Sequence, residues 1–576
     1  LGDVYKRQVQ KPHKLQILGK INFFRGVFMN STGARALIDV LLEQGVDTVF
    51  GYPGSAVLDI YDELYKCDKI RHILTCHEQA AAHAADGYAR ATGRTGVVIA
   101  TSGPGATNLV TGIAAAYMDS SPVVAITGNV KTSLLGSDSF QEVDIAGVTM
   151  PVTKYSFIAS GERGVTQDVR EAFSIAQSGR KGPVLVDIPA DIAAQSEEYE
   201  RAPKSEPSPA KEPEKAELER AAQMIEKAKR PLIYVGGGAI SSGASDALKT
   251  FAQKLHIPVA CSMMGLGAYP CSAELFLGLV GMHGNPAANM AALNCDLLIA
   301  AGARFSNRVA ASKESFAPKA KIIHIDIDAA EFDKNIISDA HILGDLGKTL
   351  EKLSIMLPPG ENSEWLGEIA EFKRRIPRPK PYAPYTVLHT LSELTKGEAN
   401  IVTDVGQNQM WTAQYYDFER PRSLITSGGL GAMGFGMGAA IGAALGKPER
   451  KTILITGDGG FHMSLSELVT LSRYNIPVVV VVMNNGVLGM VRQWQKVFYD
   501  GRFSATQPER GTDIVAVAKA FGVKGMRIKN PSQAKRVFKK ALSMDKPVVI
   551  DCRIDPDCAV LPMIPPGGDI TTAIYK

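Results

Sequence analysis

Two polar residues, Asp458 and Asn485, each directly follow an apolar run that is typical of a buried strand. Asp458 lies in the sequence KTILITGDGG, and Asn485 lies in IPVVVVVMNN. At the carboxyl ends of parallel strands, a carboxylate and an amide oxygen provide part of the oxygen shell that Mg²⁺ prefers, which phosphate and water complete. Gly459 and Gly460 precede a predicted helix, so their amides can approach a phosphate closely. The pattern predicts a site for magnesium and a diphosphate.

Each half of this pattern also has an ordinary explanation. Gly-Asp-Gly alone is more typical of a turn, and Asn485 alone is more typical of a cap at a strand end. Together, Gly-Asp-Gly and the Asn-Asn pair, separated by residues 460–483, match the thiamine diphosphate signature. Because the strands, loop and helix that the signature requires are also predicted here, we favour the cofactor site.

The elements that must position these residues alternate between strands and helices. Residues 97–101, 123–127 and 184–188 are apolar at all but one position each, as expected for strands covered on both faces of a parallel sheet. Longer segments with a helical pattern separate them. The alternation predicts an α/β fold with three doubly wound parallel-sheet domains, whose ligands bind at the carboxyl ends of the strands.

Two polar segments divide the chain. Residues 196–216 are rich in Pro, Glu, Lys and Ser, and residues 376–381 read IPRPKP, which is typical of exposed connections. The predicted organisation is an extension at 1–28, a first domain at 29–195, a linker at 196–216, a central domain at 217–360, a connector at 361–384, a third domain at 385–555 and a C-terminal tail at 556–576.

We interpret residues 1–28 as an extension that is not native. The segment is strongly basic, its run DVYKRQ resembles a translated sequencing adapter, and Met29 opens the regular pattern. Lys20 and Arg25 interrupt its apolar part, so it is a poor secretory signal.

Composition limits the class of partner. The 576 residues are 45% apolar and 21% charged, which is typical of soluble enzymes. Without the basic extension the net charge is close to zero, so neither nucleic acid nor a membrane is an expected partner. The longest apolar stretch, 476–483, is too short to cross a bilayer. The seven cysteines include no C-x-x-C pair, which predicts a cytoplasmic protein.

From Met29 to Lys576 the chain resembles the catalytic subunits of the acetolactate synthase family. In family order, the stretches that carry the resemblance are FGYPGSAVLDIYD, CHEQAAAHAADGYARATG, SGPGATN, SFQEVD, GMHG, GARF, GLGAMGFG and GMVRQWQ. The resemblance implies that the first domain binds the pyrimidine of thiamine diphosphate, the central domain binds FAD, and the third binds diphosphate and Mg²⁺. It also implies an active site shared between subunits, hence a homodimer or tetramer, and it leaves open a separate regulatory small subunit.

The family's reaction joins two small 2-keto acids. Pyruvate is decarboxylated on thiamine diphosphate, and the hydroxyethyl unit is transferred to a second keto acid. Pyruvate as acceptor gives 2-acetolactate and 2-ketobutyrate gives 2-aceto-2-hydroxybutyrate, the precursors of valine, leucine and isoleucine. This carboligation needs no net redox change, so the resemblance implies a largely structural flavin.

The resemblance assigns roles to named residues. Glu78 would hydrogen-bond a ring nitrogen of the aminopyrimidine and promote ylid formation, although by type alone it would be a helix-dipole partner. Met433 would bend the cofactor between its rings, although by type alone it would be a core filler. The other matched residues are Phe140 and Gln141 on the substrate side; Trp494, Ser55 and Ala56 at the substrate; Gly406, Gln407, Asn408, Gly431, Gly459, Gly460 and Met490 at the cofactor; and Val487 as a further metal ligand.

The central domain by itself would not indicate a flavin. Gly236-Gly237-Gly238 after a predicted strand departs from G-x-G-x-x-G and is more often a turn. His283 by type alone would be a core histidine. The resemblance assigns FAD contacts to Arg180, Ser262, Met263, Met282, His283, Gly302, Arg304, Arg308, Val309, Asp326 and Asp345.

Some positions depart from the family pattern, and other functions stay open. Ser55, Ala190, Asn408 and the pair Ser306-Asn307 stand where the family usually has Gly, Lys, His and Asp-Asp. A flavin-dependent pyruvate oxidase would share the architecture but form acetate and reduced flavin. Glyoxylate carboligase is disfavoured because it lacks a Glu at the position of Glu78. A non-catalytic subunit is disfavoured because the catalytic and metal-binding residues are all present. The preferred acceptor stays open.

Overall fold

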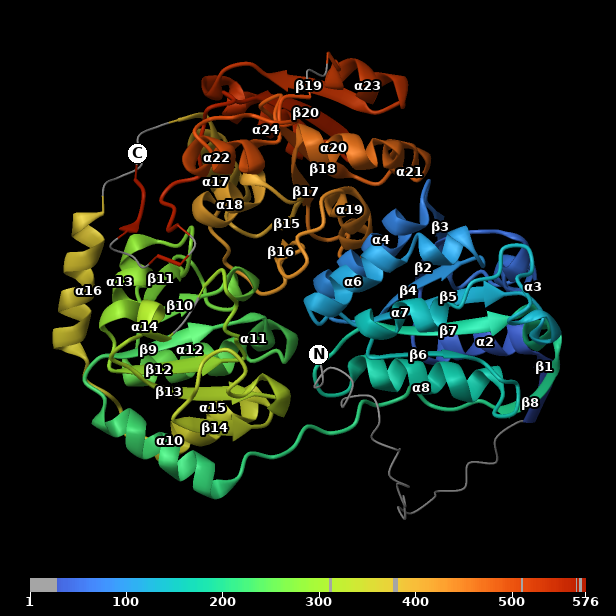
Figure 1. The fold of residues 1–576 in the computed structure, drawn as a ribbon, viewed down its shortest axis with the longest axis horizontal. Helices are drawn as coiled ribbons and strands as arrows, with labels where there is room; N and C mark the ends of the chain where they lie inside the picture. Colours follow the sequence, from blue (N-terminus) through green and yellow to red (C-terminus); the bar gives the residue numbers. More distant parts are fainter. Residues whose placement is uncertain are drawn as a thin grey trace.

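Three six-stranded sheets organise the chain. The computed structural model describes residues 28–309, 313–376, 382–508, 511–565, 567–568 and 572–575, so the predicted extension lies outside the described residues except for Phe28. In Figure 1 the N-terminal domain is blue to cyan, the central domain green to yellow, and the C-terminal domain orange to red. All neighbouring strands within the three sheets are parallel, which confirms the predicted fold class.

The N-terminal sheet has the strand order β3-β2-β4-β5-β7-β6. Its strands are β2 (Thr48–Tyr52), β3 (Arg71–Leu74), β4 (Gly96–Ala100), β5 (Val123–Asn129), β6 (Tyr155–Ile158) and β7 (Val184–Pro189). Its helices are α2 (Gly33–Glu43), α3 (Leu58–Tyr65), α4 (Glu78–Thr92), α5 (Pro104–Thr107), α6 (Val110–Met118), α7 (Ile145–Thr149), α8 (Val165–Gln177) and α9 (Ala190–Ala194). Every residue of β4, β5 and β7 is buried, because helices cover both faces of these apolar strands.

The central sheet has the order β11-β10-β9-β12-β13-β14. Its strands are β9 (Pro231–Val235), β10 (Val259–Cys261), β11 (Phe276–Leu279), β12 (Leu297–Ala301), β13 (Lys321–Asp326) and β14 (Ala340–Leu343). Its helices are α10 (Lys215–Lys227), α11 (Gly237–Ser241), α12 (Ser245–Leu255), α13 (Pro286–Asn294), α14 (Lys313–Phe316), α15 (Leu346–Met356) and α16 (Ser363–Arg375).

The C-terminal sheet has the order β16-β15-β17-β18-β20-β19. Its strands are β15 (Asn400–Thr403), β16 (Leu424–Ile425), β17 (Thr452–Gly457), β18 (Val478–Asn484), β19 (Lys524–Ile528) and β20 (Val548–Arg553). Its helices are α17 (Ala383–Thr395), α18 (Gln407–Tyr415), α19 (Phe435–Gly446), α20 (Asp458–Ser464), α21 (Leu468–Arg473), α22 (Gly489–Phe498), α23 (Ile514–Ala520) and α24 (Ala534–Leu542), and the 3₁₀ turn η6 (Leu465–Glu467) joins α20 to α21.

The predicted linker and connector both contain regular structure. Within the linker 196–216, β8 (Ser196–Glu200) pairs antiparallel with β1 (Phe28–Thr32), and the buried ring of Tyr199 holds it in place. Within the connector 361–384, α16 packs Trp365 and Ile369 against the central core. The indole nitrogen of Trp365 donates to the carbonyl of Pro231 at 3.0 Å. The stretches without regular structure are therefore shorter than the predicted linker and connector. Residues 377–381 of the proline-rich run lie outside the described residues.

Helix α4 of the N-terminal domain packs along α19 of the C-terminal domain, as Figure 1 shows between the blue and orange parts. Small residues allow the two backbones to approach. A Cβ on Gly442 would lie 1.8 Å from the carbonyl oxygen of Ala84, and one on Gly87 would lie 2.2 Å from the carbonyl oxygen of Ala439. Glycine at both positions is what permits this docking of the two domains.

We expect Gly442→Ala to lower the stability of the chain, because the new methyl group has to displace backbone. Overpacking of a close-packed interior costs about 1–3 kcal/mol. The measurement is the apparent melting temperature at a fixed scan rate, since multidomain proteins often unfold irreversibly. Gly367→Ala is the control: it lies on α16 with open space around it and should stabilise the helix by about 0.5–1 kcal/mol. Equal melting temperatures for the two variants would show that α4 and α19 do not pack this tightly.

Candidate functional site

The predicted metal ligands lie at the carboxyl edge of the C-terminal sheet. The register pairs Gly457 of β17 with Met483 of β18, so Asp458 and Asn485 follow the ends of neighbouring strands. Asp458 is the first residue of α20 and is 3% exposed. The amides of Gly459 and Gly460 lie in the first turn of the same helix. The structure therefore brings the two halves of the signature together.

Asn485 and Val487 form a tight turn after β18. The N–H of Val487 donates to Oδ1 of Asn485 at 3.2 Å, and Nδ2 of Asn485 donates to Oε1 of Gln407 at 3.2 Å. An amide oxygen has two acceptor positions, so Oδ1 can still coordinate a cation. Asp458, Asn485 and a main-chain carbonyl of Val487 are all hard oxygen ligands, and this set fits Mg²⁺. In the described part of the chain, no cluster of three or more His, Cys, Asp or Glu offers an alternative metal site.

The predicted diphosphate loop follows β15 in the same sheet. Gly406 has φ +138°, a conformation that is essentially restricted to glycine. Gln407 donates through Nε2 to Gln493 at 3.0 Å and to the carbonyl of Cys558 at 2.9 Å. Nδ2 of Asn408 donates to the carbonyls of Asp404 and Ile455, at 2.8 and 3.0 Å. Because both amide hydrogens of Asn408 are used, its side chain presents an acceptor, Oδ1, to the loop.

Met433 lies in the turn before α19 and next to the metal-site glycine. Its methyl carbon would be 3.4 Å from a Cβ on Gly459. Gly431, on the same turn, is exposed. Met490, at the start of α22, is partly buried against the core. The turn of Met433 therefore adjoins the predicted phosphate-binding helix start.

Asp404 is a site residue that the sequence analysis missed. Its carboxylate is 1% exposed and accepts N–H bonds from Gly434 and Gly436, both at 3.0 Å. Burial raises the pKa of Asp404, and the bonds from Val405, Gly434 and Gly436 oppose that shift. Asp404 thus joins the Met433 turn to the loop at Gly406. Its position directly after the strand 400–403 was the available sequence signal.

The predicted catalytic glutamate lies at the carboxyl edge of the N-terminal sheet. Glu78 is the first residue of α4 and is partly buried. Its Oε2 accepts a hydrogen bond from Nδ2 of Asn108 at 2.9 Å. A Cβ on Gly105 would lie 3.4 Å from Glu78 Oε1, so glycine leaves the carboxylate accessible on that side. Asn108 orients Glu78 and was not identified from the sequence.

The predicted substrate-side residues surround this edge. The N–H of Ala56 donates to Oγ1 of Thr101 at 3.3 Å, next to the exposed Ser55. Gln141 has φ +58° and packs its backbone against Gly103. The ring of Phe140 is 86% exposed. The ring therefore lies open to solvent beside the predicted site.

The predicted flavin residues follow the carboxyl ends of the central strands. Two of the three glycine amides after β9 are already used, because Gly236 donates to the carbonyl of Ala301 and Gly238 donates to that of Gly302. Gly236 therefore caps the short helix α11, which begins with Gly237 and Gly238 and packs on the end of β12. The residues at the strand ends are Ser262 and Met263 after β10, Met282 and His283 after β11, Gly302 and Arg304 after β12, Asp326 at the end of β13, and Asp345 after β14.

The surroundings of these residues are polar and cross domain borders. Arg180 of the N-terminal domain forms an ion pair with Glu331 of the central domain at 2.6 Å. Burial raises the pKa of Asp326 to about 6. Asp345 caps α15 through the N–H of Lys348 at 3.0 Å. Ser306 accepts from the N–H of Arg308 at 3.2 Å. A row of main-chain and side-chain groups along one sheet edge, with cations at Arg180, Arg304 and Arg308, fits an extended anionic dinucleotide.

A predicted flavin residue, Arg308, meets a predicted substrate residue, Trp494. The guanidinium of Arg308, beside Val309, lies 5.8 Å from the centre of the Trp494 ring. On α22, Trp494 also packs edge-on against Phe498 at 5.3 Å. The C-terminal tail completes this region, because the N–H of Ile564 donates to the carbonyl of Met282 at 2.8 Å, and His283 Nδ1 lies 3.2 Å from the carbonyl of Pro562.

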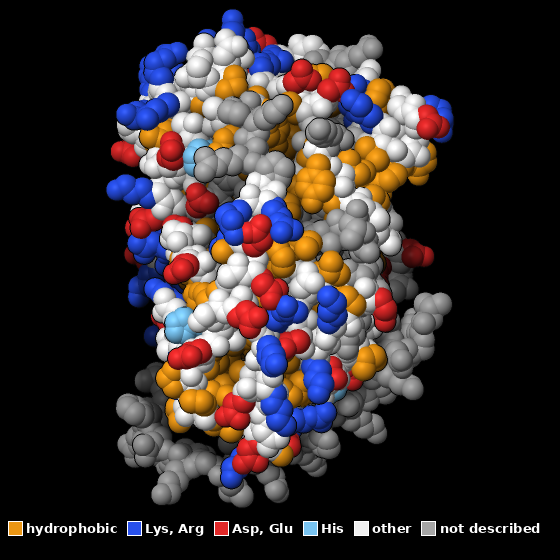
Figure 2. Space-filling view, turned by 90° about the vertical axis from the view of Figure 1, so that its left-hand side faces the viewer, with side chains coloured by type: hydrophobic (Ala, Val, Ile, Leu, Met, Phe, Trp, Pro, Cys, Tyr) orange, Lys and Arg blue, Asp and Glu red, His pale blue; other side chains and the backbone are white. Residues whose placement is uncertain are grey.

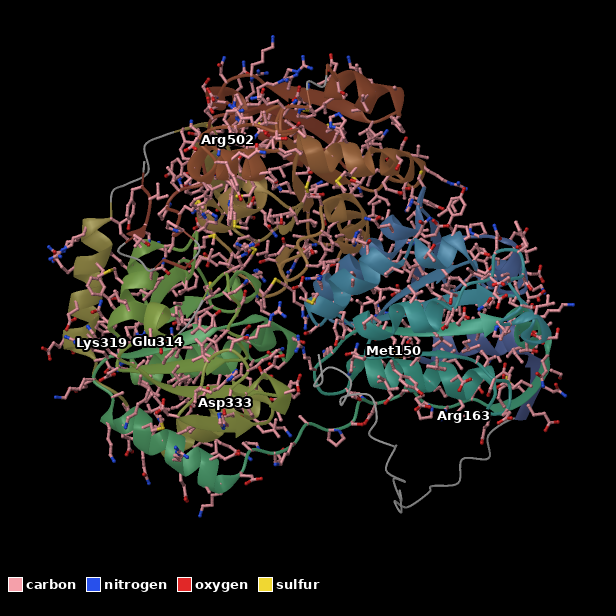
Figure 3. The ribbon with its side chains drawn as sticks, viewed as in Figure 1. Met150, Arg163, Glu314, Lys319, Asp333 and Arg502 are labelled. Atoms are coloured by element: carbon pink, nitrogen blue, oxygen red, sulfur yellow. The ribbon has the colours of Figure 1, made fainter. Side chains whose placement is uncertain are left out.

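A polar hollow of about 560 Å³ lies elsewhere, at the β6 edge of the N-terminal sheet. It is lined by residues 161–167, 170, 192 and 195–202, none of which is a predicted site residue. Figure 3 shows Arg163, at its rim, on the outer side of that domain. Glu197 already accepts the N–H groups of Val165 and Thr166 at the start of α8, at 2.9 and 3.1 Å. This hollow lacks the strand-end chemistry of the candidate site.

On the face in Figure 2, acidic and basic side chains are interspersed and form no stripe of one sign. Within the described ranges, none of the helices combines the length and the apolarity that a membrane crossing needs.

Comparison with known proteins gives the family. The models that match are the thiamine pyrophosphate enzyme N-terminal TPP binding domain at 31–148, the central domain at 218–353 and the C-terminal TPP binding domain at 404–552. Thiamine pyrophosphate is another name for thiamine diphosphate. The probable acetolactate synthase large subunit of Methanocaldococcus jannaschii is 47% identical, covering 94% of this chain and 95% of that protein.

Two further relatives carry the same name. The acetolactate synthase isozyme 3 large subunit of Escherichia coli is 42% identical over 93% of this chain and 97% of its own length. The acetolactate synthase large subunit of Corynebacterium glutamicum is 45% identical over 94% of this chain and 90% of its own length. With three matched thiamine pyrophosphate enzyme domains and such relatives along nearly its whole length, the chain belongs to the acetolactate synthase large-subunit family of thiamine diphosphate-dependent enzymes.

Proposed function

We propose that this chain is the catalytic subunit of an acetolactate synthase that joins two molecules of pyruvate, or pyruvate and 2-ketobutyrate. The observation that carries the proposal is the arrangement of Asp458 and Asn485 at neighbouring strand ends, with the Met433 methyl against Gly459. The relatives' names and the three domain matches support the same activity.

The residues of the third domain would hold the cofactor. Asp458, Asn485 and Val487 would bind Mg²⁺, and the loop Gly406–Asn408 with Gly459 and Gly460 would hold the diphosphate. Gly431 and Met490 would line the cofactor near Met433. When bound, thiamine diphosphate supplies a nucleophilic carbon and then accepts the electrons that decarboxylation releases. The protein would contribute orientation, exclusion of water and the movement of a proton.

Glu78 would hold that proton at its carboxylate. A residue that accepts and returns a proton at a ring nitrogen must lie within hydrogen-bond reach of it, and Asn108 holds the carboxylate at the sheet edge. Phe140 and Gln141 would face the substrate together with Ser55 and Ala56. We infer that a second copy of the chain covers this face, which makes the active unit a homodimer or a larger oligomer.

FAD would bind along the central domain, with Arg180 of the N-terminal domain as a further contact. The residues of the central domain that would bind it are Ser262, Met263, Met282, His283, Gly302, Arg304, Arg308, Val309, Asp326 and Asp345. Burial lowers the pKa of His283, so its ring would be neutral at pH 7. We also infer a separate small subunit as partner, because the relatives are named large subunits. A cytoplasmic location stays a prediction, which rests on the cysteine content.

The test is incubation of the purified protein with pyruvate, thiamine diphosphate, Mg²⁺ and FAD, followed by product analysis. The proposal requires 2-acetolactate, and omission of thiamine diphosphate or Mg²⁺ should remove it. A pyruvate oxidase would instead form acetate and reduce the flavin. Acetate with a bleached flavin spectrum and no 2-acetolactate would refute the carboligase.

Trp494 gives a prediction about the acceptor. One additional methylene packed against an aromatic wall is worth about 10- to 200-fold in discrimination. We therefore expect the enzyme to prefer 2-ketobutyrate over pyruvate as acceptor, and Trp494→Leu to erase most of that preference while 2-acetolactate formation continues. Competition between the two acceptors at fixed pyruvate, with both products quantified, measures the ratio.

The control for this experiment is Val497→Ala, on the same helix at a position that is 42% exposed. Its product ratio should equal that of the wild type. An unchanged ratio in Trp494→Leu would return Trp494 to a structural role as the partner of Arg308 and Phe498. Ser55 and Ala190 would then be the next positions to test.

A further inference from the structure

Two buried carboxylates each bind main-chain N–H groups of the other cofactor-binding domain. Asp119 follows α6 of the N-terminal domain, and its side chain is 1% exposed. Glu467 lies in η6 of the C-terminal domain and is 0% exposed. Neither belongs to the set of predicted cofactor or substrate ligands.

Asp119 holds a glycine pair of the C-terminal domain. Its Oδ1 accepts the N–H of Gly429 at 2.7 Å, and its Oδ2 accepts the N–H of Gly428 at 2.9 Å. The guanidinium of Arg90 lies 3.2 Å from the same Oδ2 and also donates to the carbonyl of Thr426 at 2.9 Å. Both oxygens of Asp119 are therefore used as acceptors.

The glycine pair leads directly to the Met433 turn. A Cβ on Gly429 would lie 2.8 Å from both Asp119 Oδ1 and Arg304 Nη2, so any other residue there would have to displace these two side chains. The hydroxyl of Ser427 accepts the N–H of Ala432 at 3.1 Å, which links the glycine pair to the residue before Met433. Asp119 thus holds the beginning of the Met433 turn from the N-terminal domain. The end of the turn is held by Asp404, which belongs to the C-terminal domain like the turn itself.

Glu467 holds the loop that precedes Glu78. Its Oε1 accepts the N–H of Cys76 at 2.9 Å, and its Oε2 accepts the hydroxyl of Thr470 at 2.6 Å. Close by, the hydroxyl of Tyr474 accepts the N–H of Leu74 at 3.0 Å. The C-terminal domain therefore orients the segment that ends at the first residue of α4.

We propose that Asp119 and Glu467 are positioning residues, and that each fixes the cofactor-binding loop of the opposite domain. Met433 and Glu78 then reach their working geometry only when the two domains are docked. The inference rests on the proposed thiamine diphosphate site. Its physical basis is that hydrogen bonds to a carboxylate are short and strong, and that a buried N–H without its acceptor forces the loop to rearrange.

The two carboxylates should respond differently to a neutral amide. In Asp119→Asn, the NH₂ group faces either the N–H of Gly429 or, in the flipped orientation, the N–H of Gly428 and the guanidinium of Arg90. Two donors cannot bond each other, so neither orientation keeps all the bonds. In Glu467→Gln, the oxygen can still accept from Cys76, and the NH₂ group can donate to the hydroxyl of Thr470. We therefore expect that an amide cannot replace the carboxylate of Asp119 but can replace that of Glu467.

The experiment measures two properties of each full-length variant loaded with Mg²⁺ and FAD. Calorimetry gives the affinity for thiamine diphosphate, and hydrogen–deuterium exchange gives the rate of proton loss at its thiazolium carbon. Removal of a group that orients a metal ligand typically costs about 10- to 100-fold in metal affinity or activity, and we expect effects of the same size here. Asp119→Asn should lower the affinity by that factor. Glu467→Ala should slow exchange by that factor with a smaller change in affinity, and Glu467→Gln should restore exchange.

Two control variants separate positioning from general destabilisation. Asp39→Asn removes a carboxylate that is 2% exposed, bonds Arg35 and Tyr199 and forms a longer ion pair with Arg201, and none of these partners belongs to the C-terminal domain. Thr470→Val removes the second partner of Glu467 but keeps the bond to Cys76. Both should leave affinity and exchange within about threefold of the wild type, well below the expected positioning effect.

Each outcome decides the inference. Equal exchange in Glu467→Ala and Glu467→Gln, or an affinity of Asp119→Asn equal to that of Asp39→Asn, would overturn it while leaving the proposed function intact. If Asp119→Asn does not fold, the comparison of the two Glu467 variants decides alone. A wild-type protein that neither binds thiamine diphosphate nor exchanges the proton would overturn the proposed function and this inference together.

Discussion

Asp458→Ala is expected to abolish carboligation through loss of the metal and the diphosphate. Asp458 is the one carboxylate in the predicted ligand set, and without it little remains to neutralise the charge of a diphosphate. Removing a hydrogen-bond partner of a metal ligand typically lowers affinity or activity by about 10- to 100-fold. Removing the ligand itself should therefore have a larger effect. Titration calorimetry with thiamine diphosphate, with and without Mg²⁺, measures the effect directly.

The matched control is Asp545→Ala, a carboxylate of the same domain whose side chain is 99% exposed. It should bind the cofactor as the wild type does. The assignment of the metal site fails if Asp458→Ala keeps its affinity for thiamine diphosphate and a normal dependence on Mg²⁺.

Glu78→Gln is expected to bind the cofactor and to lose most of its activity. The amide has the same shape and can still accept from Asn108, so the loop should stay in place. It cannot exchange a proton as a carboxylate does, and general acid–base catalysis is worth about 10²- to 10⁴-fold. Hydrogen–deuterium exchange at the thiazolium carbon should slow by a factor in that range, at unchanged affinity for thiamine diphosphate.

Glu171→Gln is the control for this second prediction. Glu171 is a surface residue of the same domain that pairs with Arg163, and its side chain is 37% exposed. Exchange in this variant should match the wild type. A wild-type exchange rate in Glu78→Gln would remove Glu78 from the catalytic residues.

The pattern of apolar runs was sufficient to predict the fold class. Strands such as β5 and β18 are buried along their whole length, and a strand covered on both faces is apolar at most of its positions. The same pattern located the strand ends, and with them Asp458 and Asn485. It failed for β8 and α16, where a few side chains, Tyr199 and Trp365 among them, are held by partners far away in the sequence.

By itself, then, the sequence determined the class of fold, the strand ends and the chemistry of the residues that follow them, because burial pattern and side-chain type are local properties. The tertiary structure decided what holds those residues in place. Asp404, Asp119 and Glu467 look like ordinary acidic residues in the sequence, and each has a role only through the main-chain N–H groups that it meets. Such an acceptor is defined by where a loop distant in the sequence places its backbone. For Asp119 and Glu467 that position follows from the docking of α4 on α19, which no local pattern encodes.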